Sequence, residues 1–184
     1  MTPEEVLQEV LSRLDQCGIA HMITGSFASN AHGVPRATYD ADVVIESDRQ
    51  SLERFLESLG SEFYASPEAA TAALARRHMF NIVHLATGFK VDFIIRKARP
   101  FSQEEFGRRK QIAFFGALRW FATPEDVILS KLEWAKVGSS QRQFGDAVAV
   151  ARVQRDSLDW AYLAKWAHEL GVRELLARLT REIT

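Results

Sequence analysis

The stretch from Ile23 to Glu46 constrains this chain most, because it predicts a strand, a tight turn, a helix and a second strand in close succession. Gly25 and Ser26 stand at the turn, where glycine lets the backbone approach a ligand and the following helix offers unpaired N–H groups to an anion. Asp40 and Asp42 lie on the second strand, and because strand side chains alternate, both carboxylates project from one face. An anion site beside paired carboxylates is what binding of a magnesium-bound triphosphate requires.

The size and composition of the chain fit an ordinary globular protein. Its 184 residues, 47% of them apolar, can form one domain, or a compact domain with a small helical one. The 23 basic and 24 acidic side chains nearly cancel. No global field therefore favours duplex nucleic acid or an anionic membrane, although a local basic patch remains open.

The N-terminal segment and the single cysteine predict a cytoplasmic protein. Thr2 and Glu5 have capping-box spacing and Pro3 occupies the first helical position, which predicts a helix start in place of a signal peptide. No apolar run approaches the length needed to span a bilayer. Cys17 cannot form an internal disulfide, which fits a reducing compartment, and we expect it to be a small buried residue.

Hydrophobic periodicity predicts both strands and helices in the first two thirds of the chain, and helices alone in the last third. The predicted strands are 19–24, 40–46, 79–85, 89–95, 111–115 and 118–121, the last four as two hairpins. Helices are predicted at 3–16, 27–32, 48–59, 66–77 and 102–109, and throughout the chain after Thr123. This order predicts an α+β fold with a core at 1–122 and a C-terminal helical subdomain at 123–184.

A third acid lies on a later predicted strand. Asp92 follows Val91 and precedes Phe93, and an acid in such surroundings is rarely left unpaired. It is ion-paired, metal-bound or at the exposed end of the strand. Three carboxylates from neighbouring strands could hold two Mg²⁺ ions, which can clamp the attacking and leaving oxygens of a phosphoryl-type displacement.

These residues, in this order, resemble the DNA polymerase β-like nucleotidyltransferase superfamily. The matching motifs are Gly25-Ser26, then Asp40-Ala41-Asp42, then a single Asp92 on a further strand. Three segments are also similar to small bacterial nucleotidyltransferase-like proteins, including AbiEii-type toxins of abortive-infection toxin–antitoxin pairs. They are His32-Gly33-x-x-Arg36-x-Thr38-x-Asp40-x-Asp42, Pro124-Glu125-Asp126-x-x-x-x-Lys131 and Gln141-Arg142-Gln143-x-x-Asp146.

The resemblance implies a nucleotidyltransferase fold, a mixed β-sheet flanked by helices with a C-terminal helical bundle. It implies that Asp40, Asp42 and Asp92 bind two catalytic Mg²⁺ ions and that Asp92 helps to activate an acceptor hydroxyl. The acceptor would attack the α-phosphorus of a nucleoside triphosphate and release pyrophosphate. This geometry requires the three carboxylates to converge on one point before the turn at Gly25-Ser26.

The resemblance also assigns residues to the nucleotide. Gly25 and Ser26 would hold the β- and γ-phosphates, and Lys131 would lie near the triphosphate. Arg36, on the loop before the acidic strand, could neutralise phosphate charge. Asp146 matches an acid with a less defined, accessory role.

Each of these residues also has a structural interpretation. Asp40 and Asp42 could mark a solvated strand end, and Asp92 could pair with a basic neighbour. Lys131 could be a surface lysine, and Asp146 a structural ion-pair residue. Ser26 as a helix N-cap is compatible with phosphate binding, because both use the same geometry.

A run of basic residues follows the strand that carries Asp92. The segment 96–110 holds six Lys or Arg side chains and could receive a tRNA end, although charge runs are more often solvated faces. None of the five histidines has paired-ligand spacing, so zinc is not expected.

Three functions remain open at this stage. The first is an Mg-dependent nucleotidyltransferase that modifies an RNA 3′ end or a protein hydroxyl, as the toxin of a pair with a cognate antitoxin. The second is a regulatory module that binds nucleotide without turnover, because fold does not fix function. The third is a nucleotidyltransferase that acts on a small hydroxylated molecule.

Overall fold

The computed structural model describes all 184 residues, and they divide into two compact units. The first, here the sheet unit, comprises Met1–Ile23 and Thr38–Phe121; the second, here the helical unit, comprises Thr24–Ala37 and Ala122–Thr184. The sequence predicts a core at 1–122 and a helical subdomain at 123–184. In the structure, the segment Thr24–Ala37 packs with the C-terminal helices.

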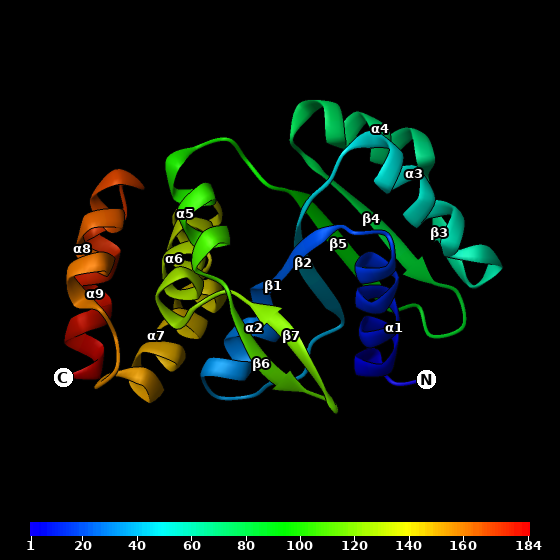
Figure 1. The fold of residues 1–184 in the computed structure, drawn as a ribbon. Helices are drawn as coiled ribbons and strands as arrows, with labels where there is room; N and C mark the ends of the chain where they lie inside the picture. Colours follow the sequence, from blue (N-terminus) through cyan, green and yellow to red (C-terminus); the bar gives the residue numbers. More distant parts are fainter. The chain divides into compact units, whose positions relative to one another are not determined.

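The sheet unit is built on one mixed sheet of seven strands in the order β3-β4-β5-β2-β1-β7-β6 (Figure 1). The strands are β1 Ala20–Thr24, β2 Asp40–Glu46, β3 Phe63–Ala65, β4 Met79–His84, β5 Lys90–Ile95, β6 Lys110–Phe114 and β7 Ala117–Phe121. The helices of this unit are α1 Pro3–Gln16, α3 Arg49–Ser58, α4 Pro67–Arg76 and α5 Pro100–Arg108, with a 3₁₀ turn η1 at Gly60–Glu62. Parallel pairing joins β2 to β5 and β1 to β7, whereas antiparallel pairing joins β3 to β4, β4 to β5 and β6 to β7.

Local sequence explains where the helices of the sheet unit begin. Thr2 and Glu5 form the predicted capping box at the start of α1, which satisfies two of the backbone N–H groups that a helix end leaves unpaired. Asp48 caps α3 and Ser66 caps α4 through bonds to the backbone N–H three residues on. The buried stripe of α1 is entirely apolar, which fixes the face that it turns to the core: Val6, Leu7, Val10, Leu11 and Leu14.

The two central strands β2 and β5 have one apolar face and one polar face. Phe93 of β5 packs edge-on against Phe55 of α3, with ring centroids 5.4 Å apart, and stacks on Phe80 of β4 at 5.0 Å. Val43 and Ile45 of β2 are fully buried as well. Because side chains alternate along a strand, the residues between these apolar ones point to the opposite face.

The helical unit contains α2 Gly25–His32, α6 Pro124–Gly138, α7 Gln141–Gln154, α8 Trp160–Glu169 and α9 Arg173–Ile183. Thr123 caps α6, Ser140 caps α7 and Asp159 caps α8. None of the helices in either unit is both long and apolar enough to cross a lipid bilayer. With the seven-stranded mixed sheet and nine α-helices, the predicted α+β fold with a C-terminal set of helices is confirmed.

Three local predictions need correction. Helix α5 begins at Pro100 with no side-chain cap, two residues before the predicted start at Ser102. A proline at the first helical position explains this start, because its fixed φ suits a helix and its missing N–H would be unpaired there anyway. Helix α2 starts at Gly25 in place of Phe27, and the short edge strand β3 was not predicted, because three residues carry no readable period.

Gly33 allows the end of α2 to approach α7 closely within the helical unit. A Cβ atom at Gly33 would lie 3.0 Å from the backbone oxygen of Ser29 and 3.0 Å from the backbone nitrogen of Val150. Both neighbours are backbone atoms, so neither can rotate away.

We expect Gly33→Ala to lower the free energy of unfolding by about 1–3 kcal/mol, because the added methyl group forces the two backbones apart. Gly145→Ala is the matched control, since Gly145 is exposed on α7 and a Cβ there meets nothing within 4 Å. That substitution should raise stability by about 0.5–1 kcal/mol. Urea unfolding followed by circular dichroism measures both, and equal effects of the two variants would contradict the close approach at Gly33.

Candidate active site

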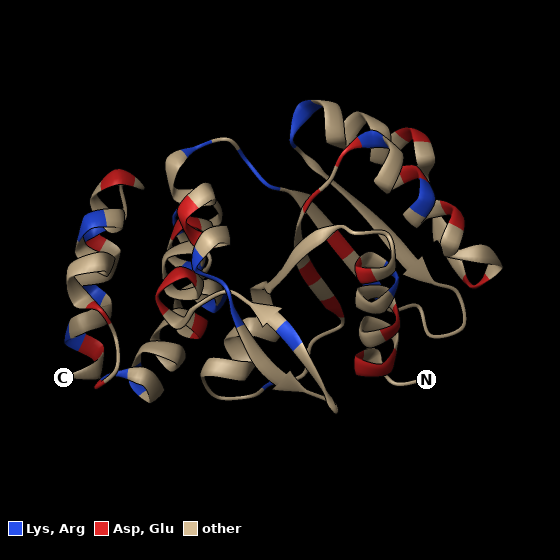
Figure 2. Cartoon of the chain, viewed as in Figure 1, with Lys and Arg blue, Asp and Glu red and all other residues tan.

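The acidic residues of the sheet unit lie on one face of two adjacent parallel strands. The register pairs Asp42 of β2 with Asp92 of β5, and Asp40 of β2 with Lys90 of β5. Paired residues on neighbouring strands share a face, and so do residues two apart on one strand. Asp40, Asp42, Lys90 and Asp92 therefore form a two-by-two array on the polar face, here called the acidic array. Figure 2 shows the acidic positions as red bands on β2 and β5.

Lys90 is the residue of this array that sequence reasoning missed. Its Nζ lies 2.6 Å from Oδ2 of Asp92, and its side chain is 39% exposed whereas that of Asp92 is 8% exposed. The hydrogen bond to Asp92 raises the pKa of Lys90, and the negative charges of Asp92, Asp40 and Asp42 add to this against a smaller effect of burial. The sequence signal that could have identified Lys90 is the spacing Lys-x-Asp, which on a strand places both side chains on one face.

The ion pair selects one of the possibilities that the sequence left open for Asp92. Oδ1 of Asp92 is buried and has no hydrogen-bond partner. An unpaired buried carboxylate oxygen is costly unless another group satisfies it. On the far side of β5, Asn81 of β4 is in register with Asp92 and brings no charge.

The acidic array suits a divalent cation in the kind of ligands that it offers. Mg²⁺ prefers carboxylate oxygens, and Asp42 and Asp92 supply them from directly paired positions, with Oδ1 of Asp92 unsatisfied. The full convergence expected from the sequence is not observed, because no three His, Cys, Asp or Glu side chains are grouped closely enough to hold a metal ion. For Asp92 a physical reason is visible, since Lys90 engages one of its two oxygens.

Asp40 is held at the start of β2 by the residue two positions before it. Thr38 Oγ1 donates to the backbone oxygen of Asp40 at 3.0 Å, and it lies 3.2 Å from Oδ1 of the same residue. Asp40 and Asp42 are half-buried, so they are not a fully solvated strand end.

Four of the predicted nucleotide-binding and accessory residues meet in the helical unit, around Asp146 of α7. Arg36 makes a bidentate pair with Asp146, with Nε at 2.9 Å from Oδ1 and Nη2 at 2.8 Å from Oδ2. Lys131 of α6 donates to Oδ2 at 2.9 Å. Nη2 of Arg36 also donates to the hydroxyl of Ser26 at 3.1 Å. This Arg36–Asp146–Lys131 cluster links α2, α6 and α7 within one unit.

Lys131 and Asp146 are shielded from solvent, whereas the side chain of Arg36 is 32% exposed. Lys131 is only 4% exposed, so it is not a surface lysine. Burial alone would raise the pKa of Asp146, but the hydrogen bonds from Arg36 and Lys131 and their positive charges outweigh it, so the pKa of Asp146 is lowered. Two cations therefore hold the one carboxylate of Asp146.

The turn into α2 has the predicted shape for an anion site. Gly25 has a φ of 60°, a left-handed conformation that glycine adopts without steric cost. Thr24 is the N-cap residue, but its side chain makes no capping bond. The expected N-cap role of Ser26 is therefore not observed, since Ser26 lies inside the first turn and accepts from Arg36.

Several basic side chains of the segment 96–110 make contacts within the sheet unit. Arg96 pairs with Glu46, and Nε of Arg99 donates to the hydroxyl of Ser102 at 3.0 Å. The guanidinium of Arg109 lies over the rings of Phe106 and Trp120, at 4.2 and 5.0 Å from their centroids. These contacts explain half of the cations of this segment without nucleic acid.

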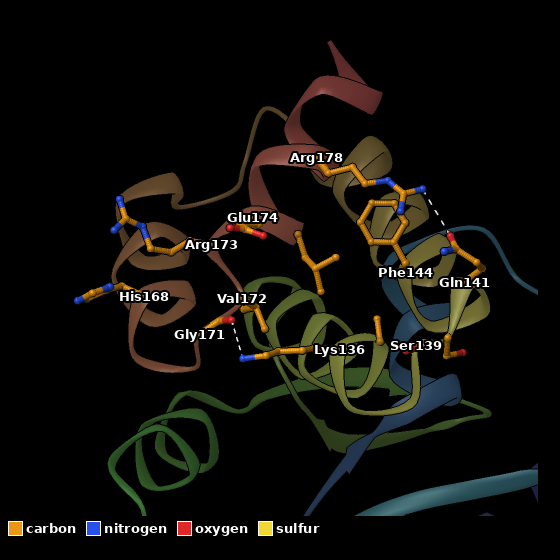
Figure 3. Close-up of a pocket in the computed structure, with 13 residues that line it drawn as sticks. Lys136, Ser139, Gln141, Phe144, His168, Gly171, Val172, Arg173, Glu174 and Arg178 are labelled. Carbon is orange, nitrogen blue, oxygen red and sulfur yellow. Dashed lines mark hydrogen bonds between the residues drawn. The ribbon is translucent and has the colours of Figure 1, made fainter.

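A cavity of about 580 Å³ in the helical unit contains none of the predicted site residues (Figure 3). Arg178 lies over the ring of Phe144 at 4.1 Å, and Lys136 Nζ donates to the backbone oxygen of Gly171 at 2.9 Å. Arg173 and His168 point away from the enclosed space (Figure 3). The cavity therefore offers an apolar wall and two cations that already have partners, and no paired carboxylates.

The chain has the fold of nucleotidyltransferases, as two solved structures show. The solution structure of the antibiotic-resistance factor ANT(2″)-Ia is similar to it with a TM-score of 0.61 and 13% identity, over 98% of this chain and 97% of that chain. A crystal structure of ANT(2″)-Ia in complex with adenylyl-2″-tobramycin gives a TM-score of 0.62 and 14% identity, over 95% and 99%.

A fungal protein shares the fold as well. The crystal structure of an antigenic nucleotidyltransferase-like protein from Paracoccidioides brasiliensis has a TM-score of 0.52 and 16% identity, over 89% of this chain and 92% of that chain. No protein-family model and no curated protein sequence matches this chain. The comparisons therefore establish the fold, whereas the AbiEii-type resemblance rests on the sequence motifs alone.

We expect Asp146→Asn to lower the free energy of unfolding by about 2–4 kcal/mol at neutral pH, because it leaves the charges of Arg36 and Lys131 without their carboxylate. Glu182→Gln is the matched control, since it removes an exposed carboxylate of the same unit and should change stability far less. Urea unfolding at several pH values measures how far the free energy of unfolding of each variant lies below that of the wild type.

The pH dependence of this difference follows from the lowered pKa of Asp146. A carboxyl whose pKa is depressed by folding stabilises the protein above its unfolded pKa, and loses that contribution as the pH falls through the folded value. The gap between the wild type and Asp146→Asn should narrow in acid. A gap that is constant with pH would contradict the charged cluster.

Proposed function

We propose that this chain is a Mg²⁺-dependent nucleotidyltransferase that transfers a nucleoside monophosphate from a nucleoside triphosphate to an acceptor hydroxyl. The observation that carries the proposal is the acidic array, in which Asp42 and Asp92 are directly paired on parallel strands with Asp40 on the same face. The nucleotidyltransferase fold also supports the proposal. The three acids follow one another along the chain in the order of the motifs that resemble nucleotidyltransferases.

In this proposal Asp40, Asp42 and Asp92 hold the two metal ions. When bound, such ions polarise the phosphate and stabilise the charge of the leaving pyrophosphate. The acceptor hydroxyl oxygen bonds to the α-phosphorus, the bond from that phosphorus to the bridging oxygen breaks, and pyrophosphate leaves. Asp92 takes the hydroxyl proton, the role that the sequence resemblance gives to it.

The triphosphate contacts in this proposal are the ones that the sequence resemblance assigns. Gly25 and Ser26 bind the β- and γ-phosphates through the N-terminus of α2, whose first N–H groups have no side-chain cap. Arg36 and Lys131 bring positive charge, and both are held by Asp146. Asp146 is then a positioning residue, because it holds both cations without contacting the nucleotide itself.

Two kinds of acceptor remain candidates. The motif resemblance to AbiEii-type toxins supports an RNA 3′ end such as that of tRNA, or a protein hydroxyl, in a cytoplasmic toxin with a cognate antitoxin. The likeness to ANT(2″)-Ia over nearly the whole of both chains, in a complex with adenylyl-2″-tobramycin, supports a small hydroxylated acceptor. The internal contacts of Arg96, Arg99 and Arg109 weigh against a basic RNA groove, so we favour the small acceptor.

Incubation with α-labelled nucleoside triphosphates and Mg²⁺ tests the activity, with total tRNA, cell lysate and a panel of aminoglycosides as separate acceptor arms. We expect label in one arm, and we expect Asp40→Asn with Asp42→Asn to reduce it at least about 100-fold, because transition-state charge then loses its stabilisation. Asp156→Asn, an exposed aspartate, is the control and should leave labelling unchanged.

Labelling that persists in the double variant would overturn the proposed role of the acidic array. Tight triphosphate binding in calorimetry without pyrophosphate release in any arm would favour the regulatory module that binds nucleotide without turnover.

A further inference from the structure

A second group of charged residues lies at the carboxyl ends of β2 and β5, away from the acidic array. A cavity of about 90 Å³ lies there, within the sheet unit, and Glu46, Arg77 and Arg96 are among the residues that line it. Glu46 is about 13 Å from Asp42 along β2, so the cavity is separate from the array. In open α/β sheets, ligands bind outside the carboxyl ends of the strands, which is where this cavity is found.

Arg96 lines this cavity with a guanidinium group that is only partly satisfied. Its Nη2 pairs with Glu46, but its Nε is buried and has no hydrogen-bond partner. The side chain of Arg96 is 17% exposed, so little of it is open to solvent. A buried donor without an acceptor is costly, and a bound oxyanion would supply the acceptor that the chain does not.

Two further arginines act on Glu46. Nη1 of Arg77 donates to the backbone oxygen of Arg96 at 2.8 Å, and the side chain of Arg77 is exposed at the cavity. Arg109 lies over the ring of Phe106, and its Nε is also buried without a partner. The hydrogen bond from Arg96 lowers the pKa of Glu46, and the positive charges of all three arginines add to this against the effect of burial. Three guanidinium groups therefore surround one carboxylate.

The backbone at Arg77 is strained. Arg77 follows the last residue of α4 with a φ of 49°, a left-handed conformation that glycine would adopt without steric cost. A long cationic side chain stands at this position instead, and local strain of this kind clusters at ligand-binding sites. The conformation of Arg77 is thus a second indication of a site, independent of the unpaired Nε of Arg96.

We propose that Arg77 and Arg96 bind one phosphate group in this cavity, and that Glu46 is an internal carboxylate which the phosphate displaces from Arg96. Guanidinium groups match phosphate oxygens in geometry and charge, and Nε of Arg96 is a donor without an acceptor. The cavity is larger than the roughly 10–15 Å³ that one water needs and far smaller than the about 300–1,000 Å³ of pockets for drug-sized ligands, so it suits a small anion. Free phosphate and the phosphate of a small phosphorylated molecule share this chemistry.

Thermal unfolding of the intact protein in rising concentrations of sodium phosphate tests this site, with sodium chloride at equal ionic strength as the reference. We expect a saturable rise in melting temperature with phosphate. Arg96→Gln and Arg77→Gln should each weaken the phosphate affinity by about tenfold, because each removes a charge-assisted hydrogen bond. Arg181→Gln, which changes an exposed arginine of α9, is the matched control and should leave the affinity unchanged. Because phosphate also stabilises proteins by exclusion from their surface, the comparison between variants is decisive.

A gain of binding in Glu46→Gln gives a readout that loss of folding cannot imitate. This substitution removes the carboxylate charge that competes for Arg96, so phosphate should bind about threefold or more tightly, even if the variant itself is less stable. Ribose 5-phosphate as a second probe distinguishes the two sources of the ligand. Tighter binding of the sugar phosphate identifies a phosphorylated small molecule and equal binding identifies free phosphate, and either result supports the site.

Equal phosphate affinity in the wild type, Arg96→Gln and Glu46→Gln would overturn the inference. So would binding of a single-stranded RNA that depends on Arg96 without any response to inorganic phosphate, because the arginines would then belong to an RNA surface. None of these variants changes the acidic array, and nucleotidyl transfer is not the readout. The outcome is therefore independent of the proposed function.

Discussion

The direct pairing of Asp42 with Asp92 across two parallel strands is the constraint on which the candidate site depends. Parallel neighbours in register place their side chains on one face, a few ångströms apart, and the opposite face of the same strands is filled by Val43, Ile45 and Phe93. A shift of register by one residue would bury the acids and expose these apolar side chains. The hydrophobic core under the sheet therefore also fixes the position of the carboxylates.

The second feature of the structure is the separation of two charged clusters. In the sheet unit, Lys90 stands beside three carboxylates and pairs with Asp92. In the helical unit, Arg36 and Lys131 both pair with Asp146, and Arg36 also donates to Ser26. In each cluster, groups of opposite charge hold the predicted site residues in place.

The sequence predicted most of the elements and the identity of the acids, because periodicity and alternation are local properties. It placed Asp40, Asp42 and Asp92 on strands and the two hairpins where the structure has them. It could not reveal that Lys90 engages Asp92, because that contact depends on a side-chain conformation and not on a motif. Nor could it show that Thr24–Ala37 packs with the C-terminal helices, since pairing between distant segments is not a property of either one.

The position of a bound metal tests the central claim most directly. In a crystal of the protein grown with MnCl₂ and a non-hydrolysable nucleoside triphosphate, anomalous scattering locates Mn²⁺ without reference to any model of the site. We predict an anomalous peak bonded to a carboxylate oxygen of Asp42 and to one of Asp92. A peak away from β2 and β5 would contradict this account.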